Sequence, residues 1–422
     1  MSPQLHELAD LRRAGTPRGV TSVCSAHPVV LRAALRHGAA TGATVLIEAT
    51  CNQVNHQGGY TGMKPSDFAS LVANIATEES CPQDQIVLGG DHLGPNPWAS
   101  LPAEEALIEA EQMVAAFVGA GFRKIHIDAS MGCAGEPVAL GDDVTADRAT
   151  LLLEVAEHAA RERGGPMPSY IIGTEVPPPG GADHELDAIT PTSPEAARAT
   201  MKVHRERFEA AGLGETLERV IGIVVQPGVE FGNHNVVRYQ RDKAQDLLGV
   251  LDDAPFVFEA HSTDYQGVEP LSELVEDGFA ILKVGPELTF VLREALYALD
   301  LIASDLAPEY GDRPLRTEME RIMLAEPGNW ERHYRGDAQT QAVLRHYSLS
   351  DRIRYYWADD AAEVAVRRLS DCLDGRTVPL PLWWQHLPDA AGEFADRSLD
   401  VEALLIWSVT RSLAAYHLAC GA

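Results

Sequence analysis

Short runs of β-forming residues alternate with amphipathic helical stretches eight times along this chain. The predicted strands occupy residues 19–27, 44–52, 85–92, 124–130, 170–176, 220–228, 256–262 and 280–286. Strands that alternate with helices favour parallel pairing through helical crossovers, and eight such units close a (β/α)8 barrel of the TIM type. The alternative is an open doubly wound sheet. That fold more often has a glycine-rich phosphate loop after its first strand, and CSAHPVV (24–30) is not one.

The chain after about residue 325 has a different pattern. It is helical and rich in Arg and Tyr, and RTVPLPLWWQHLP (376–388) then adds three prolines and two tryptophans. We therefore divide the chain into a barrel at 1–325 and a helical C-terminal appendage at 326–422, packed on the barrel. The aromatic residues of RYYW (354–357) and LWWQ (382–385) are expected to pack against barrel helices, because so much apolar area rarely stays exposed.

Acidic residues outnumber basic ones by 62 to 34, which gives a net charge of −28. This charge argues against nucleic acid and anionic membranes as partners, and an anionic substrate would need a locally positive pocket. The sequence has no apolar run of about 18 residues and no signal-peptide pattern. Its six cysteines form no C-x-x-C pair. We expect a cytoplasmic protein with reduced thiols. The composition allows either a monomer or a homo-oligomer.

Polar residues gather at the C-terminal ends of the predicted strands. Side chains alternate along a strand, and helices cover the outer face of a barrel, so polar residues of one parity should point inward. This set comprises Ser25, His27, Glu48, Thr50, Asn52, His92, His126, Asp128, Glu175, Gln226, Glu259, His261 and Lys283. Active sites of such barrels lie at this face. We therefore expect convergence there of Glu48, His92, Asp128, Glu175, Glu259 and His261.

Imidazoles mixed with carboxylates suit a divalent metal, Zn²⁺ or Mn²⁺. We predict that His92 and His261 are among its ligands and that Glu175 or Asp128 completes the set. A cation would also offset the converging acids. Such a metal would polarise a carbonyl and stabilise an enediolate.

Two carboxylates are candidate acid/base groups. Glu259 shares the inward parity of His261. Asp91 has the opposite parity and qualifies only if the strand has already ended at the glycines of GGDHLGP (89–95). Lys283 is expected as a counter-ion to the acids rather than as a Schiff-base lysine. Loops 7 and 8 commonly bind phosphate in barrels. The predicted substrate-binding residues are His27, Glu48, Asn52, Gln226, Ser262 and Lys283.

Several blocks in order resemble the GatZ/KbaZ family: LGGDHLGPN (88–96), IGTEVP (172–177), FEAHSTDYQ (258–266), AILKVGP (280–286) and SDRIRYYW (350–357). The match runs through nearly the whole chain. It implies a non-catalytic subunit of class II D-tagatose-1,6-bisphosphate aldolase, active in galactitol and N-acetylgalactosamine catabolism beside a zinc-dependent catalytic subunit. Others in the wider group resemble metal-dependent sugar-phosphate 4-epimerases. An epimerase or aldolase that acts alone on a ketohexose phosphate therefore stays open.

A more distant resemblance to class II aldolases makes Asp91 the acid/base and His92 and His261 metal ligands. The third histidine of that pattern, after strand 6, has no clean match, since this strand ends in VVQPG and His234 lies several residues into the loop. Some family members carry the label tagatose 6-phosphate kinase. That label fits poorly, because the sequence has neither a P-loop nor a kinase-type glycine-rich loop, and an acidic mouth is a poor cradle for ATP.

Overall fold

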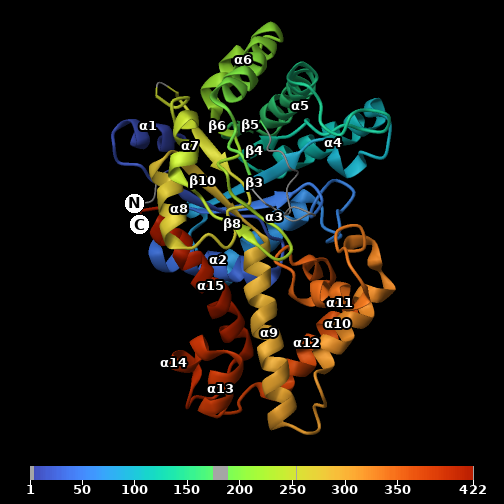
Figure 1. Cartoon of the computed structure of the whole chain (residues 1–422). Helices are drawn as coiled ribbons and strands as arrows, with labels where there is room; N and C mark the ends of the chain where they lie inside the picture. The colour runs from blue at the N-terminus through green and yellow to red at the C-terminus, as the bar shows by residue number, and fades with distance from the viewer. Residues whose placement is uncertain (1–3, 174–188, 253, 422) are drawn as a thin grey trace.

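Eight parallel strands close into a barrel in the computed structural model, which describes residues 4–173, 189–252 and 254–421 (Figure 1). The strands are β1 (Val20–Val23), β2 (Val45–Thr50), β3 (Ile86–Leu93), β4 (Lys124–Ile127), β5 (Ser169–Ile172), β6 (Val220–Val224), β9 (Val257–Ala260) and β10 (Phe279–Val284). Because β1 pairs in parallel with both β2 and β10, the ring has no edge. The predicted (β/α)8 barrel is confirmed and the open sheet is excluded.

Helices cover the outside of the barrel. The first helix, α1 (Leu8–Arg13), precedes the strands and lies at one end of the barrel. The helices around the outside are α2 (Pro28–Thr41), α3 (Pro65–Glu78), α4 (Ala103–Gly119), α5 (Asp142–Arg163), α6 (Pro194–Ala210), α7 (Arg241–Leu248), α8 (Val268–Glu276) and α9 (Pro286–Leu306). Helix α3 buries Phe68, Val72 and Ile75 on one face, as its helical spacing requires. A two-stranded hairpin, β7 (Glu230–Phe231) with β8 (Val236–Val237), interrupts the loop after β6.

The barrel interior has an apolar lower layer and a charged upper layer. Inward residues of the strands are buried together with Leu8 of α1, so this short helix closes the N-terminal end of the barrel; among them are Leu46, Val87, Ile171, Val257 and Ile281. The next inward residues along β2, β4 and β9 are Glu48, Lys124 and Glu259, and none of them is exposed. Charges buried this deeply must be paired, and Lys124 forms ion pairs with both Glu48 and Glu259. This charged layer lies directly below the mouth of the barrel.

Strand β3 departs from regular alternation at its C-terminal end. Val87 and Asp91 lie on the inward side, so the parity that the sequence analysis assigned to Asp91 is wrong. His92 adopts a φ of 50°, and the pairing with β4 shifts register between Gly90 and Leu93. This backbone lets two adjacent residues, Asp91 and His92, both reach the barrel interior.

Two glycines of GGDHLGP are required by close packing. A Cβ on Gly89 would lie 2.6 Å from Cγ of Glu48, and a Cβ on Gly94 would lie 1.7 Å from the carbonyl oxygen of Asp128. Real Cβ atoms do not approach so closely, so a larger residue at either position would displace a group of the mouth.

The C-terminal segment, meaning the chain after α9, contributes α10 (Pro314–Ala325), α11 (Ala338–Tyr347), α12 (Asp360–Leu373), α13 (Leu380–His386), α14 (Ala391–Phe394) and α15 (Val401–Ala419). Helix α10 packs on α9 and α12, whereas α15 packs on α2, α8 and α9. Figure 1 shows α9 and α15 beside each other as they leave the barrel. The end of α15 returns to β1, where Gly19 donates a hydrogen bond to the carbonyl of Cys420.

The aromatic residues of this segment divide into two groups. Tyr356, Trp357 and Trp383 are buried, as expected, but Trp384 is 64% exposed. The expected packing is therefore wrong for Trp384, which lies on the outer face of the short helix α13. Within the described part of the chain, no helix combines the length and apolarity needed to cross a bilayer.

Candidate active site

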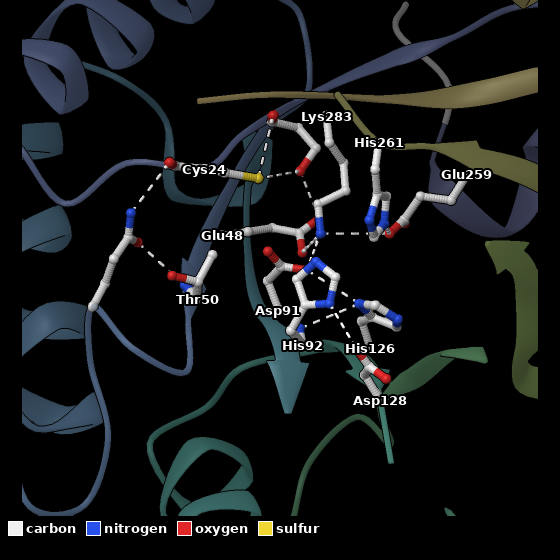
Figure 2. Close-up of polar contacts among 12 residues, drawn as sticks. Cys24, Glu48, Thr50, Asp91, His92, His126, Asp128, Glu259, His261 and Lys283 are labelled. Atoms are coloured by element: carbon white, nitrogen blue, oxygen red, sulfur yellow. Dashed lines mark hydrogen bonds and ion pairs between the residues drawn. The ribbon is translucent and has the colours of Figure 1, made fainter. Parts of the chain in front are cut away.

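Three histidines and a carboxylate meet at the C-terminal mouth of the barrel (Figure 2). The ring centroids of His92, His126 and His261 lie 4.7 to 5.3 Å apart. One ligand atom of each ring and one oxygen of Asp91 all lie within 4.8 Å of one another, and all four residues are buried. Since zinc–ligand bonds are about 2 Å long, small side-chain adjustments would bring these atoms around one ion.

Hydrogen bonds orient each of the three rings. Nδ1 of His92 donates to Oδ2 of Asp128 at 2.8 Å. Nε2 of His261 donates to Oε1 of Glu259 at 2.9 Å, and Nε2 of His126 donates to the carbonyl oxygen of Gly173 at 3.0 Å. Because each partner oxygen accepts, the other nitrogen of each ring carries the lone pair that a metal needs.

The electrostatic environment favours neutral rings of His92 and His261 beside a charged Asp128. Burial lowers the pKa of His92. Burial and the neighbouring His92 and His126 hold the pKa of His261 well below its ordinary value. Burial alone would raise the pKa of Asp128, but the hydrogen bond from His92 and further charges keep this pKa well below its ordinary value. Neutral imidazole is the form that binds metal.

Two buried lysines compensate most of the converging acids. Lys124 Nζ lies 2.6 Å from a carboxylate oxygen of both Glu48 and Glu259. Burial alone would lower the pKa of Lys124, but these two carboxylates raise it. Burial alone would raise the pKa of Glu48, but the charges of Lys124 and Lys283 lower this pKa below its ordinary value. Lys283 contacts Asp91 and lies 3.6 Å from Oε1 of Glu259, the position of the counter-ion that the sequence analysis favoured.

The donor chemistry and the charge of the cluster fit a divalent cation. Three imidazoles and one carboxylate are ligand types that Zn²⁺ binds. Nδ1 of His126 accepts a hydrogen bond from the backbone amide of His92 at 3.2 Å and lies 3.1 Å from Oδ1 of Asp91, which Lys283 also contacts. The charged groups of the cluster carry two more negative than positive charges when all are ionised, which one divalent ion would balance; they are Lys124, Lys283, Glu48, Asp91, Asp128 and Glu259.

A pocket of about 140 Å³ opens above this cluster. Asp91, His92, His261 and Lys283 line its inner part, and further lining residues include Asn52, Tyr60, Ser262, Arg354 and Tyr355. Glu48 and Glu259 are absent from the lining, so Asp91 is the acid/base candidate that reaches the pocket. The Tyr60 and Tyr355 rings meet edge to face at 4.8 Å, and the C-terminal segment thus forms one wall of the pocket.

The structure brings together five of the six residues expected to converge, and Glu175 lies outside the described residues. Asp128 lies behind the ring of His92 instead of among the four clustered groups. His126 is in the cluster instead; the sequence analysis counted it as inward but gave it no role. Lys124 was missed, although it shares the parity of His126 along β4 and the same alternation would have found it.

The predicted substrate-binding residues are distributed unevenly. Asn52, Ser262 and Lys283 line the pocket, whereas Glu48 lies below it. His27 is the N-cap of α2, where Nδ1 accepts from the amide of Val29 at 3.2 Å, and it lines a neighbouring pocket. Burial lowers the pKa of His27 to about 4.

Gln226 and His234 do not reach the cluster. The side-chain oxygen of Gln226 accepts from the amides of Gly228 and Val229 at 2.8 and 3.0 Å, so it stabilises a turn. His234 is exposed in the connection between β7 and β8. The third imidazole of the site therefore comes from His126 on β4 and not from the loop after β6.

The chain is similar to known proteins over nearly its whole length. Residues 5–421 match the family model described as D-tagatose-1,6-bisphosphate aldolase subunit GatZ/KbaZ-like. The chain is 58% identical over 425 residues to the D-tagatose 6-phosphate 4-epimerase of Agrobacterium fabrum (strain C58), covering 100% of this chain and 99% of that protein. It is 50% identical to a crystal structure from Sinorhizobium meliloti 1021 named a probable tagatose 6 phosphate kinase, with a TM-score of 0.87 and coverage of 96% of this chain and 100% of that one.

Proposed function

The chain belongs to the D-tagatose-1,6-bisphosphate aldolase subunit GatZ/KbaZ-like family, and we propose that it is an enzyme in its own right, a metal-dependent 4-epimerase that interconverts D-tagatose 6-phosphate and D-fructose 6-phosphate. The observation that carries the proposal is the buried cluster of Asp91, His92, His126 and His261 beneath a pocket. The full-length identity of 58% to a protein named for this reaction supports it.

The position of C4 in the substrate limits the chemistry. The C4 hydrogen is not adjacent to the C2 carbonyl, so simple proton removal cannot invert this centre. Loss of the proton from the C4 hydroxyl lets the C3–C4 bond break, and its electron pair moves toward the C2 carbonyl oxygen. The resulting aldehyde turns its other face, the C3–C4 bond forms again and O4 regains its proton. Nothing is oxidised or reduced, so no nucleotide cofactor is needed.

The residues of the mouth suit these steps. A divalent metal held by His92, His126 and His261 would supply Lewis-acid polarisation of the substrate carbonyl. Of the carboxylates in and around the histidine cluster, Asp91 is the one that lines the pocket, and we assign to it the proton of the C4 hydroxyl. The ammonium of Lys283 contacts Asp91 and stabilises its charged form. Glu259 lies below the pocket between Lys124 and His261, where it orients the ring of His261.

The accessory-subunit role that the family description implies is the second candidate. It requires a catalytic partner and no turnover by this chain alone. A kinase role has less support, because the sequence contains no recognisable ATP-phosphate loop and Asp91 and Asp264 both line the pocket.

The test is an assay of the purified chain, alone and with its genomic aldolase partner, with added Zn²⁺ or Mn²⁺. We expect the chain alone to form D-fructose 6-phosphate from D-tagatose 6-phosphate, and His92→Ala to abolish both metal uptake and turnover while leaving the fold intact. Activity only in the presence of the partner, on tagatose 1,6-bisphosphate, would establish the accessory role instead. Transfer of phosphate from ATP to tagatose 6-phosphate would establish the kinase.

A further inference from the structure

One permanent cation at the pocket is not used by the chemistry described above. Arg354 lies on the 3₁₀ turn Arg352–Tyr356 of the C-terminal segment and lines the pocket. Among the described lining residues, the Lys and Arg side chains are Lys283 and Arg354. The sequence between residues 173 and 189 contains neither Lys nor Arg. Since Lys283 is bound to Asp91, Arg354 is the cation available to an incoming anion.

No described carboxylate neutralises Arg354 directly. The nearest acid in the chain, Asp351, accepts from Nε of Arg293 at 3.0 Å. The two carboxylates that line the pocket are also engaged: Asp91 with Lys283, and Asp264 with the amides of Gly285 and Glu287 at 3.1 and 2.7 Å. In a protein with a net charge of −28, a guanidinium that faces a pocket without a carboxylate partner marks a place for a substrate anion.

Hydrogen bonds hold the Arg354 side chain in place. Nη1 donates to the carbonyl oxygens of Ser350 and Asp351, and Nη2 donates to the hydroxyl of Tyr355 at 2.9 Å. The Tyr355 ring is in turn fixed edge to face against Tyr60. These neutral partners, all within the described residues, leave the Nε–H and one Nη2–H of Arg354. Two such donors can bind two oxygens of one phosphate.

We infer that Arg354 binds the phosphate group of the substrate and so determines the preference for a phosphorylated ketohexose; this inference rests on the proposed function. The reacting carbons lie toward Asp91, His92 and His261, and the terminal phosphate lies toward Arg354 and Tyr355. The C-terminal segment thereby supplies the specificity, while the barrel supplies the chemistry.

The experiment measures binding separately from turnover. Calorimetric titrations of the metal-loaded protein with D-fructose 6-phosphate and with D-fructose are compared for the wild type, Arg354→Gln, Arg354→Lys and Arg335→Gln. The last variant removes one exposed arginine of the same segment away from the pocket. We expect Arg354→Gln to weaken binding of the phosphate ester about 100-fold and to leave that of D-fructose unchanged. The affinity of Arg354→Lys for the phosphate ester should lie between those of the wild type and Arg354→Gln. The affinity of Arg335→Gln should equal that of the wild type.

Turnover of D-tagatose 6-phosphate and of D-tagatose by the same variants separates the two proposals. Arg354→Gln should lower kcat/KM for the phosphate ester and leave the value for D-tagatose unchanged, which also shows that the variant is folded. Arginine-dependent binding without turnover in the wild type would support the inference and overturn the epimerase. Equal affinity of wild type and Arg354→Gln for the ester would overturn the inference, whatever the turnover, and equal loss for both sugars would assign Arg354 a structural role.

Discussion

Nδ1 of His92 donates a hydrogen bond of 2.8 Å to the carboxylate of Asp128. Asp128 also accepts from the hydroxyl of Ser130 at 2.6 Å, so its position does not depend on His92 alone. His92 has a positive φ, and the hydrogen bond to Asp128 fixes the orientation of its ring so that Nε2 points toward the cluster. Asp128 thus orients a ligand instead of being one of the four clustered groups.

Asp128→Asn should weaken metal binding by about 10- to 100-fold, because loss of the carboxylate removes the interaction that fixes the tautomer and orientation of His92. Zn²⁺ competition titration against a chromophoric chelator measures the effect. Asp242→Asn, a change on the exposed face of α7, is the matched control. An unchanged zinc affinity in Asp128→Asn would show that the pair has no role in metal binding.

Lys124→Met should lower the free energy of unfolding by about 3–5 kcal/mol, since it leaves two fully buried carboxylates without their ammonium partner. Adding Glu48→Gln removes one of these charges. We expect the double variant to be more stable than the sum of the single effects predicts, by about 1 kcal/mol or more. Urea unfolding in the presence of EDTA measures all four proteins, and strictly additive effects would contradict the pairing.

Glu157 of α5 should stabilise the fold in a pH-dependent way. It accepts from the Tyr170 hydroxyl at 2.6 Å and from two nitrogens of Arg219 at 2.8 and 2.9 Å. Burial would raise the pKa of Glu157, but these hydrogen bonds hold it below the ordinary value of 4.5. A carboxylate with a lowered folded-state pKa contributes stability that is complete above the unfolded pKa and is lost as the pH falls through the folded pKa.

Glu157→Gln should therefore cost about 2 kcal/mol at pH 7, and its difference from the wild type should shrink as the pH falls below 4.5. Urea unfolding midpoints at a series of pH values provide the measurement. Glu154→Gln, on the exposed side of the same helix, should match the wild type throughout. A difference that stays constant down to the lowest accessible pH would mean that packing, and not charge, accounts for the effect.

The two adjacent tryptophans of α13 should differ strongly. Trp383 is fully buried, so Trp383→Ala should cost about 3–5 kcal/mol through lost burial and a cavity. Trp384 is 64% exposed, so Trp384→Ala should change stability by no more than about 0.5 kcal/mol. Thermal unfolding of the two variants compares them directly. A large loss in Trp384→Ala would show that a further surface covers this side chain.

Local sequence periodicity was sufficient to predict the barrel and most of the charged interior. Alternation along β2, β4 and β9 placed Glu48, His126, Glu259 and His261 inward, and the structure has them there. The same alternation also places Lys124 inward, two positions before His126 on β4, but the sequence analysis did not include this residue. It failed at β3, because a positive φ at His92 and a register shift with β4 change the side on which side chains emerge.

By itself, the sequence determined which strands form, which of their residues face inward, and that histidines and carboxylates meet at one mouth, because these properties repeat with the local period of a strand. Only the tertiary structure decided that Asp91 joins His92 inside, that Asp128 lies behind a ligand, and that Arg354 and Tyr355 reach the pocket beside Tyr60. These contacts join residues up to about 300 positions apart. They depend on ring closure and on the packing of the C-terminal helices, which no local pattern encodes.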